Sequence, residues 1–318
     1  MHPYLVTFED LPQWAQDNAY IRTGYRRPGD APPRVPSKEN PLPVPEKHTA
    51  HTTKRSVPAT RRHVPGATQS VMQEQETYCH DSYYRCWRSI WDYWHNETAV
   101  VAIGLLCAHL AGMGGLPYTL WPAPSSVVPP VPHLRASPQM RAADKMDMLT
   151  LGIFLSGTIF CLTCSAVYHS VSCCSQAVAK KFNRLDYMGI VVLTVGSNIP
   201  ALRFGLYCHP KEMAWYTVLI VSLGFLALYV LIKPQYATAK YRPVRAGLFI
   251  ALGLCGIAPI LHMLTLTRRF DFLFATLGFG YIAWSGFVYI FGAMLYVAHF
   301  PERFATGTFD YIGSSHQL

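Results

Sequence analysis

The chain has 318 residues, of which 51% are hydrophobic and 14% are charged, and its formal net charge at pH 7 is +9. In a soluble protein such a positive charge would suggest nucleic-acid binding, but no basic helix or zinc-finger spacing accompanies it, so we expect no nucleic-acid partner. Basic loops that face anionic lipids explain the charge better, and the composition predicts an all-α, polytopic membrane protein with a polar N-terminal region.

The predicted cytoplasmic N-terminal region covers residues 1–95. Its middle part, about residues 29–80, is rich in proline and polar residues, and it cannot bury enough apolar surface to offset the entropy of ordering. We therefore expect a disordered insert there. Residues 83–95 alternate basic and aromatic side chains at helical spacing, which is typical of a helix that lies along lipid headgroups.

Apolar runs dominate residues 96–318, which we assign to a transmembrane helix bundle. Each run is long enough for a helix to cross the hydrocarbon core, which takes about 20 residues. The charge bias of the connections and the basic tail predict cytoplasmic N- and C-termini, in the plasma membrane or an endomembrane. The six predicted spans are 99–120, 146–169, 186–207, 212–233, 244–266 and 272–299.

The second predicted span ends in polar residues. Ser165 and His169 are four residues apart and share one face of a helix. Asp186 opens the next span after a basic loop, so His169 and Asp186 are expected at the same membrane face. An imidazole and a carboxylate held together are typical of a metal site. A histidine facing headgroups and an aspartate acting as helix N-cap fit these two residues equally well.

The C-terminal segment adds a further histidine. An even number of spans returns the chain to the side on which it began, so His316 is expected on the face that carries His169 and Asp186. Three potential metal ligands from separate parts of the chain therefore converge on one side of the membrane.

These segments resemble the progestin and adipoQ receptor family, which includes the adiponectin receptors and the haemolysin III-related proteins. Residues 11–28 and 83–98 also look like the N-terminal region of the family, so only the proline-rich insert lies outside the resemblance. The resemblance is carried by 165–169 (SAVYH), 183–189 (NRLDYMG), 301–304 (PERF), 307–310 (GTFD) and 315–317 (SHQ).

The resemblance implies a seven-helix bundle that binds zinc (Zn2+). In the family the zinc is held by a histidine at the end of helix two and by an H-x-x-x-H pair on helix seven, with a helix-three aspartate nearby. In this sequence the corresponding residues are His169, His316 and Asp186. The second histidine of the pair would follow four residues after His316, so we expect the seventh helix to be missing from this sequence.

The resemblance also implies a zinc-dependent amide hydrolase that acts on ceramide-like lipids. A zinc ion with an open position makes water nucleophilic near neutral pH, with Asp186 and Ser165 as the catalytic residues beside it. Because one histidine is missing, we expect the activity to be impaired in the 318-residue form.

Two other functions stay open. The first is a receptor or regulator of lipid and metal homeostasis, in which zinc is structural and the partner is an extracellular protein ligand. The second is a transporter, which is disfavoured because the ionisable residues gather at one interface and not at the midplane. In every case membrane lipids surround the protein.

Overall fold

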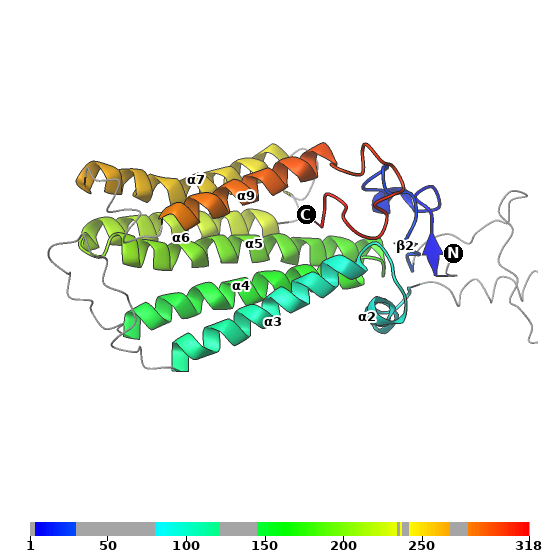
Figure 1. Cartoon of the computed structure of the whole chain (residues 1–318), viewed down its shortest axis with the longest axis horizontal. Coiled ribbons are helices and arrows are strands. Elements are labelled where there is room, and N and C mark those ends of the chain that lie inside the picture. The colour runs from blue at the N-terminus through cyan, green and yellow to red at the C-terminus, as the bar shows by residue number, and fades with distance from the viewer. Residues whose placement is uncertain are drawn as a thin grey trace, which may run out of the picture.

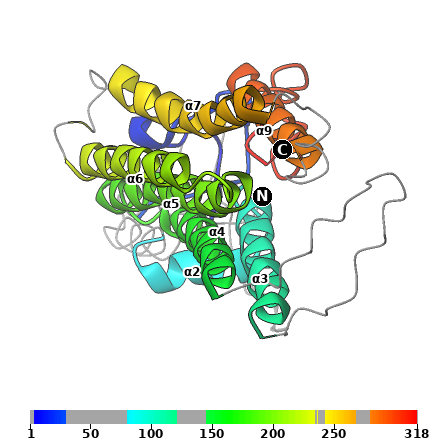
Figure 2. The ribbon, with the colours of Figure 1, turned by 90° about the vertical axis from the view of Figure 1, so that its left-hand side faces the viewer.

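The computed structural model describes residues 4–29, 80–120, 145–233, 236, 242–267 and 279–317. Most of the predicted insert at 29–80 therefore lies outside the described residues. Long helices run side by side along the molecule (Figure 1), and Figure 2 shows them from one end. They are α3 (Thr98–Leu120), α4 (Lys145–Val171), α5 (Gln176–Gly205), α6 (Pro210–Ile232), α7 (Arg242–Thr267) and α9 (Phe279–Ala298).

Five of these helices, α4, α5, α6, α7 and α9, are long and apolar enough to cross a membrane. The described apolar part of α3, Thr98–Met113, is shorter, although the helix itself continues to Leu120. Each predicted span corresponds to one of the six helices, and residues 272–278 of the last span lie outside the described part. The helices confirm the predicted all-α, polytopic membrane class.

The third predicted span begins earlier than expected. The basic segment before Asp186, which the sequence predicts to be a loop, is helical, because α5 already starts at Gln176, where the Ser175 hydroxyl accepts a hydrogen bond from the Val178 amide. Alanine, lysine and arginine all favour helix formation. The charged lysines and arginine of this segment therefore mark where the apolar run begins, and the helix itself begins earlier. Asp186 therefore lies inside α5, ten residues after its first residue Gln176, and is not an N-cap.

Helices α4 and α5 pack closely because glycines line the contact. A Cβ atom on Gly189 would lie 2.9 Å from the Cα atom of Cys161, which no side chain tolerates without a shift of the backbone. Close approach through small residues is the usual way in which membrane helices pack. At the far end of the same pair, Arg203 Nε lies 2.9 Å from Asp147 Oδ1, an ion pair that links the two helices.

The N-terminal and C-terminal segments share one end of the bundle (Figure 1). Strands β1 (Leu5–Val6) and β2 (Tyr25–Arg26) pair antiparallel, and a short helix, η1 (Gln13–Ala15), lies between them. The backbone amide of Gly307 donates to the carbonyl of Tyr20 at 3.2 Å. The two segments therefore form one polar layer over the ends of the long helices.

Helix α2 (Tyr83–Asp92) runs across the long helices, and Figure 1 shows it almost end on. Its N-cap is Ser82, and it ends three residues earlier than the predicted helix at 83–95. One face is buried around Cys86, whereas Trp91 and, just beyond the helix, Trp94 are exposed. This orientation fits a helix along headgroups, which stays a prediction.

Candidate histidine site

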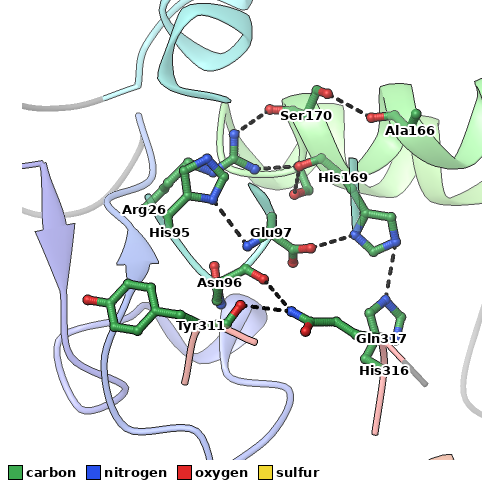
Figure 3. A network of polar contacts seen from close by, with 11 residues as sticks. Arg26, His95, Asn96, Glu97, Ala166, His169, Ser170, Tyr311, His316 and Gln317 are labelled. Carbon is green, nitrogen blue, oxygen red and sulfur yellow. Dashed lines mark hydrogen bonds and ion pairs between the residues drawn. The ribbon is translucent and has the colours of Figure 1, made fainter. Parts of the chain in front are cut away.

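His169 lies in the last turn of α4, and its imidazole is buried. One ring nitrogen, Nδ1, is 2.8 Å from Glu97 Oε2, at the entrance of α3. The other, Nε2, is 3.2 Å from Nε2 of His316 (Figure 3). The structure therefore brings together two histidines that are 147 residues apart in the chain.

His316 is held in place by its neighbours in the chain. Ser315 donates its backbone N–H to Glu302 Oε2 at 2.8 Å and its hydroxyl to the same carboxylate. On the other side, the Gln317 amide donates to the carbonyls of Asn96 and Tyr311, each at 3.1 Å. The imidazole is thus carried by a segment that is fixed immediately before and after it.

Glu302 organises this segment from the inside. It is fully buried, and besides Ser315 it accepts a hydrogen bond from the Asn18 side-chain amide at 3.0 Å. Burial by itself raises the pKa of the Glu302 carboxyl, but the hydrogen bonds from Ser315 outweigh burial, with help from Asn18, so the pKa lies below its ordinary value. Glu302 is therefore an anion at neutral pH that ties the N-terminal segment to the segment carrying His316.

Asp186 and Ser165 approach each other between α5 and α4. The Ser165 hydroxyl lies within hydrogen-bonding reach of the Asp186 carboxylate, and both His169 and His316 are close enough to act on Asp186 electrostatically. The four predicted site residues therefore lie in one neighbourhood. Ser165 is one turn before His169, so Asp186 lies deeper in the bundle than the histidine pair.

Within the described ranges, no group of three His, Cys, Asp or Glu side chains is arranged so that all three could hold a metal ion directly. The histidine pair itself fits two positions around zinc. Two nitrogens bound at about 2.0–2.1 Å in tetrahedral geometry are separated by roughly 3.3 Å. The observed separation of 3.2 Å between the Nε2 atoms is close to that value.

Glu97 is a carboxylate beside His169 that the sequence pattern did not indicate as a site residue. Burial raises the pKa of Glu97, but the charge and the hydrogen bond of His169 outweigh burial and hold the pKa well below its usual range. The Glu97 carboxylate is therefore ionised and can only accept hydrogen bonds. Its place next to the start of α3 was visible in the sequence, but its distance from His169, 72 residues, gave no sign of contact.

Arg26 is a second residue that the sequence did not indicate. Its guanidinium is buried, and Nη1 donates to the Ser170 carbonyl at 2.6 Å and to the Ser89 hydroxyl at 3.1 Å. Nη2 donates to the His169 carbonyl. A cation that binds the free carbonyls at a helix C-terminus stabilises that end of the helix. Arg26 thus holds the last turn of α4, which carries His169.

Asp310 fastens the N-terminal segment to the C-terminal one. Its carboxylate accepts the backbone N–H groups of Arg22 and Thr23, each at 2.9 Å, and the Thr23 hydroxyl at 2.6 Å. Hydrogen bonds to a charged acceptor are the stronger kind. Glu302 and Asp310 therefore both accept hydrogen bonds that join the N-terminal segment to the C-terminal segment.

A surface cavity of about 880 Å³ lies along the first half of α4. It is lined by residues between Lys145 and Phe160 and by Val192 of α5. It ends more than two helical turns before His169, so it is not part of the histidine site.

The sequence pattern described as haemolysin-III related matches residues 92–318, which is most of the chain. The chain belongs to the haemolysin-III related family. All the residues of the histidine site except those of the N-terminal segment fall within the matched part.

Individual relatives carry receptor or seven-helix names. The chain is 28% identical to progestin and adipoQ receptor-like protein 1 of Caenorhabditis elegans, over 99% of this chain and 56% of the relative. It is 35% identical to the adiponectin receptor protein of Drosophila melanogaster, over 58% of this chain and 40% of the relative. It is 37% identical to heptahelical transmembrane protein 3 of Arabidopsis thaliana, over 52% and 48%. The chain thus spans about half the length of these relatives.

Proposed function

We propose that this family member binds zinc through His169 and His316, with Asp186 close to the metal, and that it acts in lipid and metal homeostasis in the membrane. The observation that supports the proposal most directly is the 3.2 Å approach of the two Nε2 atoms. The buried His169 imidazole gains little from facing the exposed His316 imidazole unless a proton or a metal ion lies between them. Zinc prefers imidazole nitrogen, and carboxylate oxygen is a common further ligand.

Zinc content tests this proposal. Purified protein in detergent is expected to retain zinc after dialysis, and His169→Ala is expected to abolish retention because the most buried ligand is lost. His316→Ala and Asp186→Ala should weaken it, the latter by about 10–100-fold if Asp186 acts through water. The matched control is His262→Ala on α7, whose imidazole contacts Tyr216 at 3.1 Å. Zinc that survives His169→Ala would place the ligands elsewhere.

We further propose that the reaction class is hydrolysis of an amide in a ceramide-like lipid. Bound zinc would supply the Lewis acid for such a reaction. The chain contributes the Asp186 carboxylate as a proton acceptor and the Ser165 hydroxyl as a donor that orients it. Both lie on the bundle side of the histidine pair, where a lipid amide would enter from the membrane.

Fatty acid release and zinc binding, measured on the same purified protein, distinguish an enzyme from the alternative functions. Fatty acid release from ceramide that disappears in His169→Ala would support the hydrolase. Zinc binding without release would favour a receptor or regulator with structural zinc and an extracellular protein ligand, a function that the names of the relatives also suggest. Release that is unaffected by His169→Ala would contradict the zinc mechanism. A transporter is the weakest candidate, because His169, Asp186 and His316 lie together at one end of the bundle and not at the midplane.

We also propose that the end carrying the histidine pair faces the cytoplasm. Basic residues are enriched in the N-terminal region, and the positive-inside rule places such regions in the cytoplasm. An epitope tag before Met1 is expected to be accessible to antibody only after the plasma membrane is permeabilised. Staining of intact cells would reverse the orientation and place the histidines on the outer face.

A further inference from the structure

We propose that Glu97 is the positioning residue of His169: its carboxylate accepts the Nδ1 hydrogen, so that Nε2 is the nitrogen left to bind a metal ion and points at His316. The expected effect of Glu97 on zinc affinity rests on the proposed function. The orientation of the imidazole does not depend on zinc. It adds to the site a residue from outside the predicted ligand set.

The geometry of the imidazole carries the inference. A neutral imidazole has one N–H and one lone pair, and the partner of one nitrogen decides which form is present. Glu97 Oε2 lies 2.8 Å from Nδ1, and an ionised carboxylate can only accept. Nδ1 therefore carries a hydrogen, and Nε2 is the nitrogen left to bind a metal ion and faces the second histidine at 3.2 Å (Figure 3).

Glu97 is itself held firmly, as a positioning residue must be. Its backbone N–H donates to His95 Nδ1 at 3.1 Å, and its carbonyl accepts the Val101 amide at 3.1 Å in the first turn of α3. The His95 amide donates to the Thr98 hydroxyl at 3.1 Å, which closes the turn. A carboxylate at a helix N-terminus is also stabilised by the helix dipole.

The same turn reaches the other histidine. Asn96, next to Glu97, accepts a hydrogen bond from Gln317, next to His316. Asn96 also donates its own N–H to the Gly24 carbonyl at 3.0 Å. The turn before α3 therefore orients His169 by a side chain and the His316 segment by its backbone. In metal sites, a carboxylate on the second nitrogen of a ligating histidine is worth about 10–100-fold in affinity.

A plain structural ion pair would predict something different. If Glu97 only ties α3 to α4, its replacement lowers the stability of the fold. Which ring nitrogen of His169 carries hydrogen, and the zinc affinity of the folded protein, then stay unchanged. Glu97→Gln separates the two roles, because the amide oxygen still accepts from Nδ1 while the negative charge is gone. Glu97→Ala removes both. The control is Glu9→Gln, which removes one carboxylate from the exposed ion pair with Arg22.

The experiment uses the full chain in detergent and two measurements. ¹⁵N chemical shifts of labelled histidine, assigned with His169→Ala, report which ring nitrogen of His169 carries hydrogen in metal-free protein. Competition with a zinc chelator of known affinity reports the dissociation constant. We expect Glu97→Ala to lose the Nδ1–H form and to bind zinc about 10–100-fold more weakly. Glu97→Gln should keep the Nδ1–H form with a smaller loss, and Glu9→Gln should match the wild type.

The outcomes distinguish this inference from the proposed function. An unchanged imidazole form and an unchanged zinc affinity in Glu97→Ala would overturn the role of Glu97. A wild type that binds no zinc but loses the Nδ1–H form in Glu97→Ala would refute the zinc proposal while supporting the positioning role. A Glu97→Gln protein as impaired as Glu97→Ala in both measurements would overturn the hydrogen-bond account, since the amide oxygen can replace the acceptor.

Discussion

Replacing Arg26 by alanine is expected to release the N-terminal segment from the bundle and to lower the melting temperature markedly. The buried guanidinium serves the Cys86, His169 and Ser170 carbonyls and the Ser89 hydroxyl. Each buried acceptor left without a donor costs about 1–3 kcal/mol. With partial replacement by water, we expect a loss of roughly 3–5 kcal/mol, at the upper end for single substitutions.

Thermal unfolding in detergent and hydrogen exchange of residues 4–29 measure this effect. The matched control is Arg22→Ala in the same segment, whose ion pair with Glu9 at 2.8 Å is solvent-exposed and should contribute little to stability. Arg26→Lys should recover only part of the loss, because an ammonium lacks the planar fork that reaches several acceptors. Equal effects of Arg26→Ala and Arg22→Ala would contradict the role assigned to the buried guanidinium.

Acidification from pH 7 to pH 5 is expected to loosen the same docked region through His80. Its Nδ1 lies 2.8 Å from the Arg27 carbonyl, and Nε2 contacts the Tyr93 hydroxyl. Burial, followed by the charge of Arg26, lowers the pKa of His80 from its ordinary 6.5 to about 4, and the Arg27 carbonyl opposes this shift.

The direction of the effect follows from proton binding. Released His80 binds a proton below about pH 6.5, whereas docked His80 stays neutral down to about pH 4. Docking is therefore at full strength above pH 6.5 and weakens as the pH falls between these values. At pH 5 the loss is about 2 kcal/mol. His95, whose pKa burial lowers to about 2, adds a contribution of the same sign.

Hydrogen exchange as a function of pH, corrected for the intrinsic rate, tests this prediction. Residues 4–29 and α2 should lose protection at pH 5, whereas α5 and α6 should not. His80→Asn keeps a donor for the Arg27 carbonyl and does not titrate, so it should remove most of the pH dependence. A wild-type profile that is flat from pH 7 to pH 5 would show that His80 is not docked in its neutral form.

Much of the fold could be predicted from the sequence because the bilayer imposes a length. Apolar runs of about 20 residues locate the helices, and helical periodicity places Ser165 and His169 on one face. The start of α5 could not be read in this way. Hydropathy marks where a helix leaves the hydrocarbon, but the backbone stays helical as far as the cap at Ser175. This is why Asp186 lies inside a helix and not at its end.

The sequence by itself determined the membrane class, the approximate spans and the convergence of His169, Asp186 and His316 on one side of the bundle. Only the tertiary structure decided which groups hold those residues. Glu97 meets His169 across 72 residues of chain, and Arg26 meets the same residue across 143. Periodicity reports on neighbours one turn apart, whereas contacts between distant residues depend on how whole elements pack, which no local pattern encodes.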